Sequence, residues 1–360
     1  MGLLRDIVTT PLSWLYSMGV SIHNMLFDWG IKKSEEFDIP IVCVGNITVG
    51  GTGKTPMTEH LVQLLSSYYN VAVLSRGYKR KTKGFILAQP DMSYRRIGDE
   101  PKQIKLKFPS IPLAVCEKRT EGIRRLREHH PEINLIILDD AFQHRKVEAW
   151  VNIVLVDFNN PYYVDKMLPL GRLRDSKRSL HRAHMFVVTK CPDSMRPIDC
   201  RIMLKHIELM PYQSLYFTKM VASEALPLFS ELSGDTPLKK KSPVIAISSI
   251  ANPTSFFENM ARDYQLIDKF AFADHHTYRM SDIAKVEAAL EKAPENTAII
   301  MTEKDAVKLI LSRKISEQTR AKMYYKSISV EFIDNGKRNF VRILSQYVAE
   351  NQKYNITHPE

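Results

Sequence analysis

The sequence predicts an α/β fold in which helices cover a mostly parallel sheet, and three observations support this prediction. Short β-rich runs alternate with amphipathic helical stretches, which is the pattern of consecutive βα units. A glycine-rich loop between residues 45 and 55 joins a buried strand to a helix. The same alternation starts again near Pro243, after a charged segment. We therefore expect a larger α/β domain and a second, smaller one.

An amphipathic helix is predicted at the N-terminus, over residues 10–30. Thr10 is suited to cap this helix, Pro11 fits its first turn and Gly30 can end it. Large apolar side chains recur at helical spacing: Leu15, Met18, Ile22, Met25, Leu26 and Trp29. Either the protein core or a membrane surface can cover this stripe. No apolar run reaches about 18 residues, so we expect no membrane-spanning helix.

The first series of elements builds the larger domain. Its predicted strands are 39–46, 71–75, 113–116, 133–138, 152–157 and 185–189, and its first covering helix is 55–68. We place this domain at residues 1–212 and expect the C-terminal helix, 338–360, to join it. Residues 213–242 are predicted to form a hinge or linker, because they end in a charged, Pro-containing stretch. Residues 243–337 are then the smaller α/β domain.

The composition indicates a globular protein with an anionic partner. Of the 360 residues, 44% are hydrophobic and 25% are charged, and 51 Lys and Arg against 40 Asp and Glu give a net charge of +11. This excess suits a phosphorylated substrate, a membrane surface or a nucleic acid. The four cysteines have neither CxxC nor zinc-type spacing, so we expect reduced thiols.

The strongest chemical signal is VGNITVGGTGKT, at residues 44–55. It lies between a predicted strand and a helix, like the phosphate-binding loop of a P-loop NTPase, although Thr48 replaces the first glycine of the strict pattern. Lys54 can reach the β- and γ-phosphates and Thr55 can bind Mg²⁺. The residues expected to bind the triphosphate are Gly50, Gly51, Thr52, Gly53, Lys54 and Thr55. We therefore expect ATP and Mg²⁺ as ligands.

Two carboxylates end the predicted strand 133–138. Asp139 or Asp140 can hold Mg²⁺ through water, as carboxylates at strand ends do in phosphoryl-transfer enzymes. Gln143 and His144 follow in the same DDAFQH run and can contact nucleotide or substrate. A helix cap or a loop ion pair would also account for these residues.

A general base is the next requirement, and two segments offer one. IGDEP, at residues 97–101, carries Asp99, which can accept a hydroxyl proton. DHHTY, at 274–278, carries His275 and His276 without a third metal ligand at matching spacing. On spacing alone, a turn aspartate is the favoured interpretation of the first segment, and a solvated helix cap is the usual one for the second.

Two basic segments can contact a phosphorylated substrate. SRGYKRK, at residues 75–81, places Arg76 and Tyr78 after a strand end, where open α/β sheets bind ligands. LPLGRLRDSKR, at 168–178, has enough positive charge for a phosphate clamp or lid. A solvated basic loop is the alternative for both.

Seven segments, in this order along the chain, resemble the tetraacyldisaccharide 4′-kinases, the lipid A 4′-kinases of Gram-negative bacteria: GNITVGGTGKTP, SRGY, GDEP, DDAFQH, PLGRLRD, DHHTY and TEKDAVKL. The resemblance runs from the N-terminal helix to about Leu311. It implies transfer of the γ-phosphate of ATP to the 4′-hydroxyl of a tetraacylated glucosamine disaccharide 1-phosphate, giving lipid IVA. It also implies two α/β domains joined by a hinge, and a location on the cytoplasmic face of the inner membrane.

The resemblance implies roles for individual residues. It places Mg²⁺ near Thr55 and Asp139, with Asp140 beside them, and it assigns Lys54 to the catalytic group. The base is Asp99, paired with His275. The residues expected to contact the substrate are Arg76, Tyr78, Arg119, His144, Arg172, Arg174 and Asp175.

Two other classes of protein compete with this interpretation. A P-loop ATPase or GTPase switch usually has Lys before the paired glycines, where this chain has Val49, and it needs no lipid-facing helix. A nucleic-acid-binding ATPase would need a recognisable module, whereas the basic residues here are scattered or lie beside Gly and Pro turns. We therefore expect an acylated disaccharide phosphate lipid as partner, with no nucleic acid and no obligate protein partner.

Overall fold

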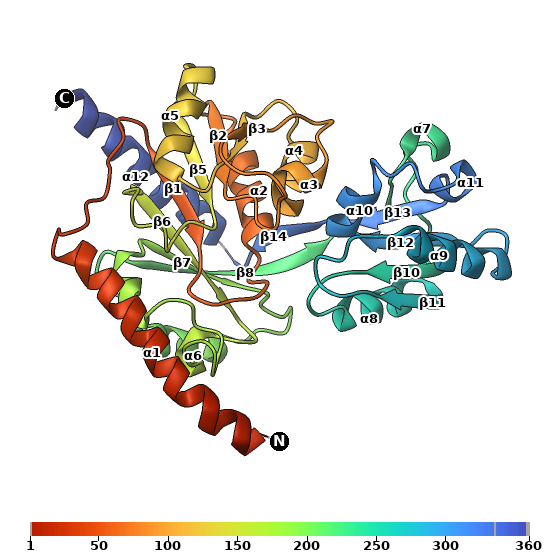
Figure 1. Cartoon of the computed structure of the whole chain (residues 1–360), viewed down its shortest axis with the longest axis horizontal. Helices are drawn as coiled ribbons and strands as arrows, with labels where there is room; N and C mark the ends of the chain where they lie inside the picture. Colours follow the sequence, from red (N-terminus) through yellow and green to blue (C-terminus); the bar gives the residue numbers. More distant parts are fainter. Residues whose placement is uncertain (1, 335, 358–360) are drawn as a thin grey trace.

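The computed structural model describes residues 2–334 and 336–357, and its strands form two sheets flanked by helices (Figure 1). In spatial order, the first sheet contains β14 (Ile328–Phe332), β8 (Ser214–Ala222), β7 (Met185–Thr189), β6 (Val151–Asp157), β1 (Ile41–Gly45), β5 (Leu135–Asp139), β2 (Val71–Ser75), β4 (Leu113–Val115) and β3 (Ile86–Leu87). From β8 to β4 all neighbours are parallel, and the two edge strands are antiparallel. The predicted parallel architecture is confirmed.

The second sheet is smaller and also mostly parallel. Its order is β11 (Gln265–Ala271), β10 (Pro243–Ser248), β12 (Ala298–Thr302), β13 (Met323–Lys326) and β9 (Leu226–Pro227). Only β9 runs antiparallel to its neighbour in this sheet. The predicted second α/β unit is therefore present.

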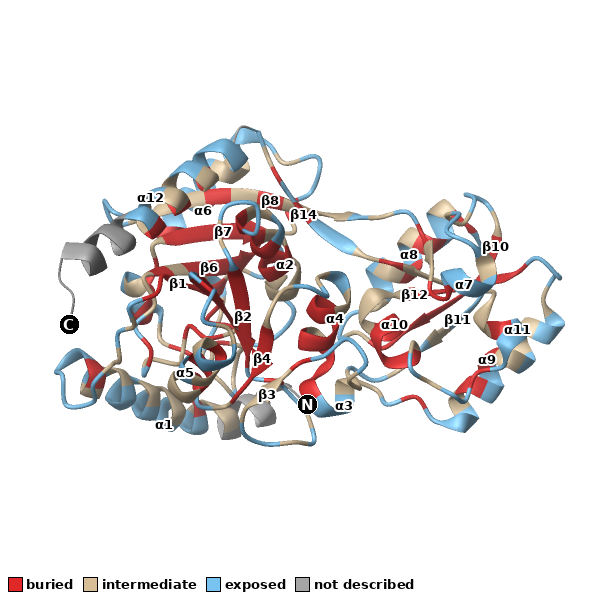
Figure 2. Ribbon diagram, turned by 90° about the horizontal axis from the view of Figure 1, so that it is seen from above, coloured by how far each residue is buried: buried red, intermediate tan, exposed pale blue. Residues whose placement is uncertain are grey.

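Helices cover both faces of the first sheet, and the apolar strands lie buried between them (Figure 2). One face packs against α2 (Lys54–Leu65), α4 (Asp99–Lys107) and the described part of α12 (Gly336–Thr357). The other face packs against α5 (Arg119–His129) and α6 (Pro197–Ile207). Phe340, Leu344 and Val348 of α12 are fully buried in the first of these cores. Residues 358–360 of the predicted C-terminal helix lie outside the described residues.

The chain passes between the two sheets along two paired strands, which changes the bounds of the predicted hinge. β8 pairs with β7 of the first sheet and antiparallel with β14, along which the chain returns. Residues 214–222 therefore extend the first sheet, although the predicted linker began at 213. Residues 328–332, placed in the smaller domain, also belong to the first sheet. β14 alternates exposed and buried positions over most of its length, and most residues of β8 are only half-buried. Both strands therefore lack the continuous apolar run by which the central strands were predicted.

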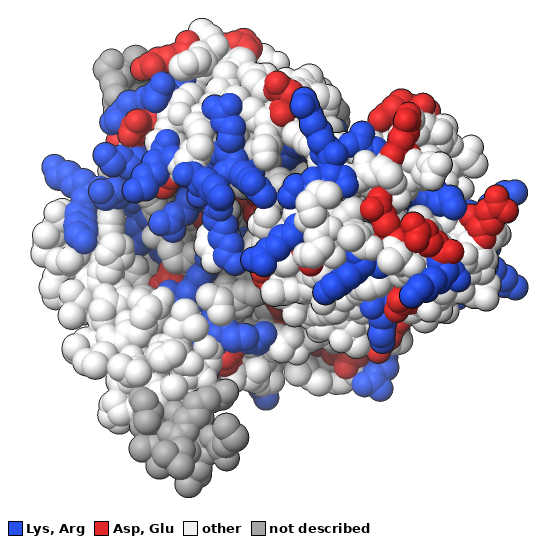
Figure 3. All heavy atoms as spheres, turned by 45° about the vertical axis from the view of Figure 1, so that its right-hand side comes forward, with Lys and Arg blue, Asp and Glu red and all other residues white. Residues whose placement is uncertain are grey.

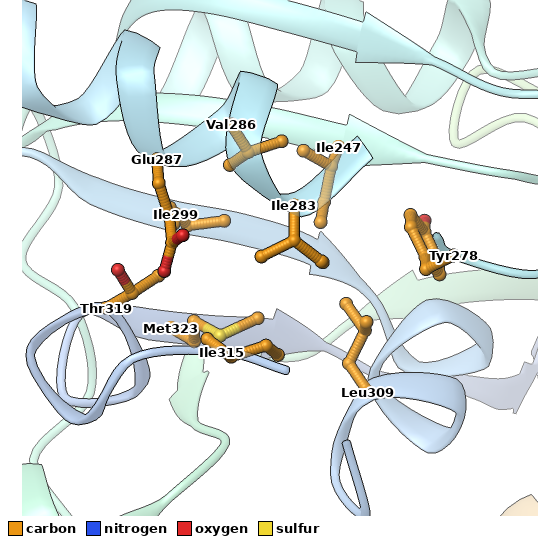
Figure 4. Close-up of a pocket in the computed structure, with 10 residues that line it drawn as sticks. All are labelled: Ile247, Tyr278, Ile283, Val286, Glu287, Ile299, Leu309, Ile315, Thr319 and Met323. Atoms are coloured by element: carbon orange, nitrogen blue, oxygen red, sulfur yellow. The ribbon is translucent and has the colours of Figure 1, made fainter. Parts of the chain in front are cut away.

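The second unit has its own apolar core on each face of its sheet. Figure 4 shows one pocket in this core, where side chains of α9 (Met280–Lys292) face those of the strands. Ile283 and Val286 of α9 and Ile299 of β12 are among its buried lining residues. The lining is mainly aliphatic and includes Leu309 of α10 (Glu303–Leu309). This apolar packing therefore helps to hold α10 in position.

The N-terminal helix, α1 (Gly2–Asp28), starts earlier than predicted. Its structure also shows whether the protein core covers its apolar stripe. α1 begins before Thr10, so Thr10 does not cap it and Pro11 lies inside the helix. The helix continues through Pro11, although Pro costs the interior one backbone hydrogen bond. Trp14 and Leu15 in the helix are 74% and 60% exposed, and Trp29, just after the helix, is 69% exposed. The apolar stripe therefore does not pack on the protein core.

The side of α1 that faces the protein is mostly polar, apart from the buried Phe27 near its end. Ser13 Oγ donates to the Met167 carbonyl at 2.8 Å, and Asn24 Nδ2 donates to Asp175 Oδ1 at 2.9 Å. Within the described residues, no helix is long and apolar enough to cross a membrane.

A buried polar cluster joins the second unit to the first. Gln103 Nε2 of α4 donates to Glu59 Oε1 of α2 at 2.8 Å and to Glu303 Oε2 of α10 at 3.1 Å. Lys107 Nζ lies 2.6 Å from Glu59 and 3.7 Å from Glu303. Burial first, and then the neighbouring Glu59 charge, raise the pKa of Glu303 to about 7.

We predict that Glu303 makes the protein less stable as the pH rises. Its pKa in the folded protein is about 7 against an ordinary 4.5, so between these values the folded state holds a proton that the unfolded state has lost. Stability must then fall across that window. Glu303→Gln should flatten the fall and be more stable than the parent above pH 7. Urea unfolding at several pH values measures this.

The matched control is Glu317→Gln, at an exposed position, which should leave the pH dependence of stability unchanged. Parallel stability curves for the parent and Glu303→Gln would contradict the assignment.

Candidate functional site

The glycine-rich loop joins β1 to α2 and forms a site for an anion. Gly50 and Gly53 have φ of 108° and 86°, conformations that residues with a Cβ rarely adopt. Gly53 precedes α2, and a Cβ there would collide with the side chain of Met220. The first-turn N–H groups of α2, which begins at Lys54, have no partner within the helix and are available to phosphate oxygens.

Asn46 holds this loop in shape. Its side chain is fully buried. Its Nδ2 donates to Thr52 Oγ1 at 2.8 Å and to Thr48 Oγ1 at 3.2 Å. Its Oδ1 accepts from Arg174 Nη2 at 2.6 Å and from Lys54 Nζ at 3.4 Å. The predicted phosphate-binding lysine is thus placed by a residue that motif spacing did not single out.

The segment 172–175 runs beside the phosphate loop. Val49 N donates to the Arg172 carbonyl at 2.8 Å, and Arg174 N donates to the Ile47 carbonyl at 2.8 Å. The guanidinium of Arg172 turns away from the loop, since its Nε donates to Asp165 Oδ2 at 2.8 Å. Of Arg172 and Arg174, both predicted to contact substrate, only Arg174 therefore directs its side chain to the phosphate loop.

The paired aspartates after β5 lie in different surroundings. Asp139 is buried and accepts hydrogen bonds from Thr58 Oγ1 at 3.2 Å and Ser75 Oγ at 3.0 Å. Burial, with a smaller effect from the Asp140 charge, raises the pKa of Asp139 to about 6. Asp140 forms an ion pair with Arg174 and lies 3.8 Å from Lys54 Nζ.

These surroundings fit a magnesium ion at Asp139 better than at Asp140. In the described chain no lysine or arginine forms an ion pair with Asp139, and no cluster of three or more His, Cys, Asp or Glu residues can hold a metal alone. A metal here would need oxygen ligands from the nucleotide, as Mg²⁺ sites commonly have. The hydroxyl of Thr55, in the first turn of α2, completes a suitable donor set. The metal-binding roles remain predictions, and the Asp140 carboxylate already has two cationic partners.

Three of the residues predicted to contact substrate, Arg119, His144 and Asp175, instead make hydrogen bonds within the protein. Arg119 is 2% exposed, and it donates to the carbonyls of Cys116 and Asp139. The backbone N–H of Arg119 lies 3.4 Å from His144 Nε2. Burial first, then nearby positive charges, lower the pKa of His144 to about 4, so His144 is neutral. Asp175 is also 2% exposed and holds Asn24 of α1.

Asp99 and His275 meet across the two units. Asp99 is the first residue of α4, and His275 Nδ1 lies 3.0 Å from its Oδ2. The Tyr78 ring is 5.6 Å from the His275 ring, edge to face. The close approach of Gly77 and Gly98, where a Cβ on Gly98 would lie 3.1 Å from Gly77 Cα, brings the loop with Tyr78 against the start of α4. Arg76, in the same loop, is exposed to solvent.

A cavity of about 360 Å³ opens between α1 and the phosphate-loop region. Its lining residues come from α1 and from the segments after β5 and β6: Tyr16, Gly19, Val20, His23, Asn24, Gln143, Arg174 and Asp175. Arg174 lines this cavity and also bonds Asn46 of the phosphate loop, so the cavity adjoins that loop.

Comparison with known proteins assigns this arrangement to a family. A family model described as tetraacyldisaccharide-1-P 4′-kinase matches residues 5–349. The chain belongs to the tetraacyldisaccharide 4′-kinase family. It is 44% identical over 348 residues to the tetraacyldisaccharide 4′-kinase of Phocaeicola vulgatus, covering 95% of both chains. It is 40% identical over 354 residues to that of Flavobacterium johnsoniae, covering 98% of this chain and 99% of the relative.

A solved structure agrees with these relatives. The crystal structure of LpxK from Aquifex aeolicus in complex with ATP is 26% identical, with a TM-score of 0.72, and the match covers 96% of this chain and 99% of that one. The chain is therefore a tetraacyldisaccharide 4′-kinase family enzyme, a kinase that transfers phosphate to a hydroxyl group. ATP as its nucleotide agrees with the structural relative. The resemblance found in the sequence is confirmed.

We predict that Asn46→Ala weakens nucleotide binding. The substitution removes two donors to loop threonines and one acceptor for Lys54 and Arg174. Hydrogen bonds to charged groups contribute about 1.5–3 kcal/mol each, so the Kd for ATP should rise roughly tenfold or more. Isothermal titration calorimetry measures it.

The control is Gln63→Ala, at an exposed position of α2, which should bind ATP like the parent. An unchanged Kd for a folded Asn46→Ala protein would show that the loop keeps its shape without this side chain.

Proposed function

We propose that this protein transfers the γ-phosphate of ATP to the 4′-hydroxyl of a tetraacylated glucosamine disaccharide 1-phosphate, and that Asp99 is its general base. The observation that supports this best is the 3.0 Å contact between Asp99 and His275. The base lies on α4, which also contacts α2, the helix that follows the phosphate loop. The charge of Glu100, the residue after Asp99, acts on Lys54 and Asp139. The start of α4 therefore lies near the proposed nucleotide site, as proton removal from an acceptor hydroxyl requires.

Different residues bind the phosphates and accept the proton. Lys54 and the first turn of α2 hold the phosphates. The proton of the 4′-hydroxyl passes to Asp99 while the hydroxyl oxygen bonds to the γ-phosphorus and the bond to the ADP oxygen breaks. Mg²⁺, held near Thr55 and Asp139, would neutralise charge on the phosphates. Burial of Lys54 lowers its pKa, with Asp140 partly restoring it.

The protein surface suits an anionic lipid substrate. Lys and Arg side chains gather on one face of the larger unit (Figure 3), and the net charge is +11. A disaccharide 1-phosphate is attracted to such a surface. The α1 cavity lies between the phosphate loop and the exposed apolar stripe, so a sugar bound there has its acyl chains near that stripe.

We further propose that α1 docks the enzyme on the cytoplasmic face of the inner membrane. The exposed stripe has interfacial tryptophans at Trp14 and Trp29, and Lys32 and Lys33 follow the helix. Amphipathic helices of this kind lie in the interface plane with their apolar side in the lipid. A lysine near the surface adds about 1 kcal/mol of attraction to anionic lipid.

The Asp99–His275 pairing can be tested by a double-mutant cycle. Removing a positioned base costs about 10²–10⁴-fold in turnover. Asp99→Ala and His275→Ala should each reduce kcat, and the double variant should lose much less than the product of the two losses, because the residues act as one unit. Steady-state kinetics of all four proteins with ATP and the lipid substrate measures this.

The control is His276→Ala, because His276 pairs with Asp282 at 2.8 Å within the second unit and should not affect kcat beyond a small factor. If the kcat loss of the double variant equals the product of the two single losses, Asp99 and His275 act independently. Near-normal turnover of Asp99→Ala would remove it as the base.

Membrane docking predicts that polar substitutions on α1 release the protein from vesicles. Leu15→Gln, Met18→Gln and Ile22→Gln, combined, should reduce binding to anionic vesicles about a hundredfold or more, since each buried side chain contributes about 1.5–3 kcal/mol. Turnover of detergent-dispersed substrate should persist, because these side chains do not contact the site. Co-sedimentation and kinetics measure both properties.

The matched control is Ile198→Gln with Ile202→Gln on α6, two equally exposed apolar positions on another helix. Undiminished vesicle binding of the α1 variant, or equal loss in the α6 variant, would exclude α1 as the anchor.

A further inference from the structure

Two lysines one turn apart on α10 reach the Asp99–His275 pair. Lys304 Nζ lies 3.2 Å from His275 Nε2. Lys308 Nζ lies 3.6 Å from Asp99 Oδ2, and its side chain is fully buried. Neither lysine has a part in the proton transfer described above.

α10 is fixed in place by Asp305, which has no exposed surface. Asp305 accepts from Ser249 N at 3.0 Å, from Tyr278 OH at 2.9 Å and from Thr302 Oγ1 at 2.6 Å, and it also bonds the Ser249 hydroxyl. Lys308 Nζ in turn donates to Ser249 Oγ at 2.7 Å. The loop that carries His275 and the helix that carries the lysines therefore share one buried hydrogen-bond network.

Lys304 determines which nitrogen of His275 carries the proton. An ammonium group is a donor only, so His275 Nε2 accepts from Lys304. In the neutral ring the proton is then on Nδ1, from which it is donated to Asp99.

Lys308 acts on the other partner. Both His275 and Lys308 approach Oδ2 of Asp99. In the described part of the chain, no side-chain hydrogen bond is made to Oδ1. This leaves Oδ1 for the acceptor hydroxyl.

We propose that Lys304 and Lys308 are positioning residues of phosphoryl transfer: Lys308 holds the Asp99 carboxylate with Oδ1 directed to the acceptor, and Lys304 keeps His275 in the tautomer that donates to Asp99. This inference rests on the proposed role of Asp99 as the base. It also explains chemically why two lysines follow in the segment TEKDAVKL.

The charges around Asp99 set the expected pH dependence. Burial raises the pKa of Asp99, but the hydrogen bond from His275 and the charges of Lys308 and Lys304 outweigh it, so the net shift is downward. The acidic groups nearby are themselves paired: Glu100 lies 3.2 Å and Asp274 3.6 Å from Lys304, and Asp305 lies 3.8 Å from Lys308. Removing the Lys308 charge therefore raises the pKa of Asp99.

The test compares amide and apolar replacements of each lysine in the full-length enzyme. Lys308→Gln keeps a donor for Ser249 but loses the charge, so kcat should fall roughly tenfold to a hundredfold through misplacement of the base. The acidic limb of its kcat–pH profile should move to higher pH. Lys304→Met should lose kcat similarly, whereas Lys304→Gln, which can still donate to Nε2, should keep most of it.

Lys105→Met is the matched control. Lys105 is a buried lysine of α4 whose Nζ donates to the carbonyls of Pro109 and Ile111 at 2.8 and 3.0 Å. Its loss should lower the melting temperature without moving the acidic limb. Thermal unfolding of every variant separates lost folding from lost positioning.

The outcomes distinguish this inference from the proposed function. A parental kcat and pH profile in Lys308→Gln, or equal losses in Lys304→Gln and Lys304→Met, would overturn the corresponding positioning role while Asp99→Asn remains inactive. An active Asp99→Asn enzyme would instead overturn the base assignment, and the inference with it.

Discussion

The contact between α4 and α10 is the constraint on which the rest of the site depends. The two helices meet through oppositely charged and hydrogen-bonding side chains along their length: Asp99 with Lys308, Glu100 with Lys304, and Lys107 with Glu303. α4 also contacts α2, which begins at the phosphate loop. One continuous path of packed helices therefore fixes the distance between the phosphate loop and Asp99, the proposed base. His275 belongs to the same unit as α10, so the contact between α4 and α10 also brings His275 to Asp99.

A second path joins the phosphate loop to the N-terminal helix α1. The segment 172–175 bonds the loop through its backbone and Asn46 through Arg174, and it bonds α1 through Asp175 and the Arg174 carbonyl. The PLGRLRD motif therefore combines two tasks. Its arginine side chains meet acidic partners, while its backbone serves as the common support of the nucleotide site and the N-terminal helix.

The sequence allowed the architecture to be predicted where local pattern and tertiary role coincide. Buried parallel strands are continuous apolar runs, and a glycine-rich strand–helix junction implies a phosphate site. β8 and β14 were missed because their faces alternate, and the start of α1 was misplaced because Pro11 lies inside the helix. The interior positions of Arg119 and Asp175 and the hydrogen bonds of Asn46 depend on partners up to 151 residues away in the chain. No local spacing reveals such partners. Lys308 belonged to a recognised motif, but only the fold places it against Asp99.

The orientation of α1, polar side inward and apolar side outward, changes how substrate concentration should be understood. In the membrane-docked state proposed above, the enzyme would meet its lipid by lateral diffusion within a thin surface layer. The quantity that governs occupancy of the site is then the mole fraction of substrate in the membrane rather than its amount per volume of solution. Added inert lipid dilutes the substrate without changing its bulk concentration, and ATP, arriving from water, is unaffected. The lipid would then be supplied from a two-dimensional surface and ATP from the solution volume.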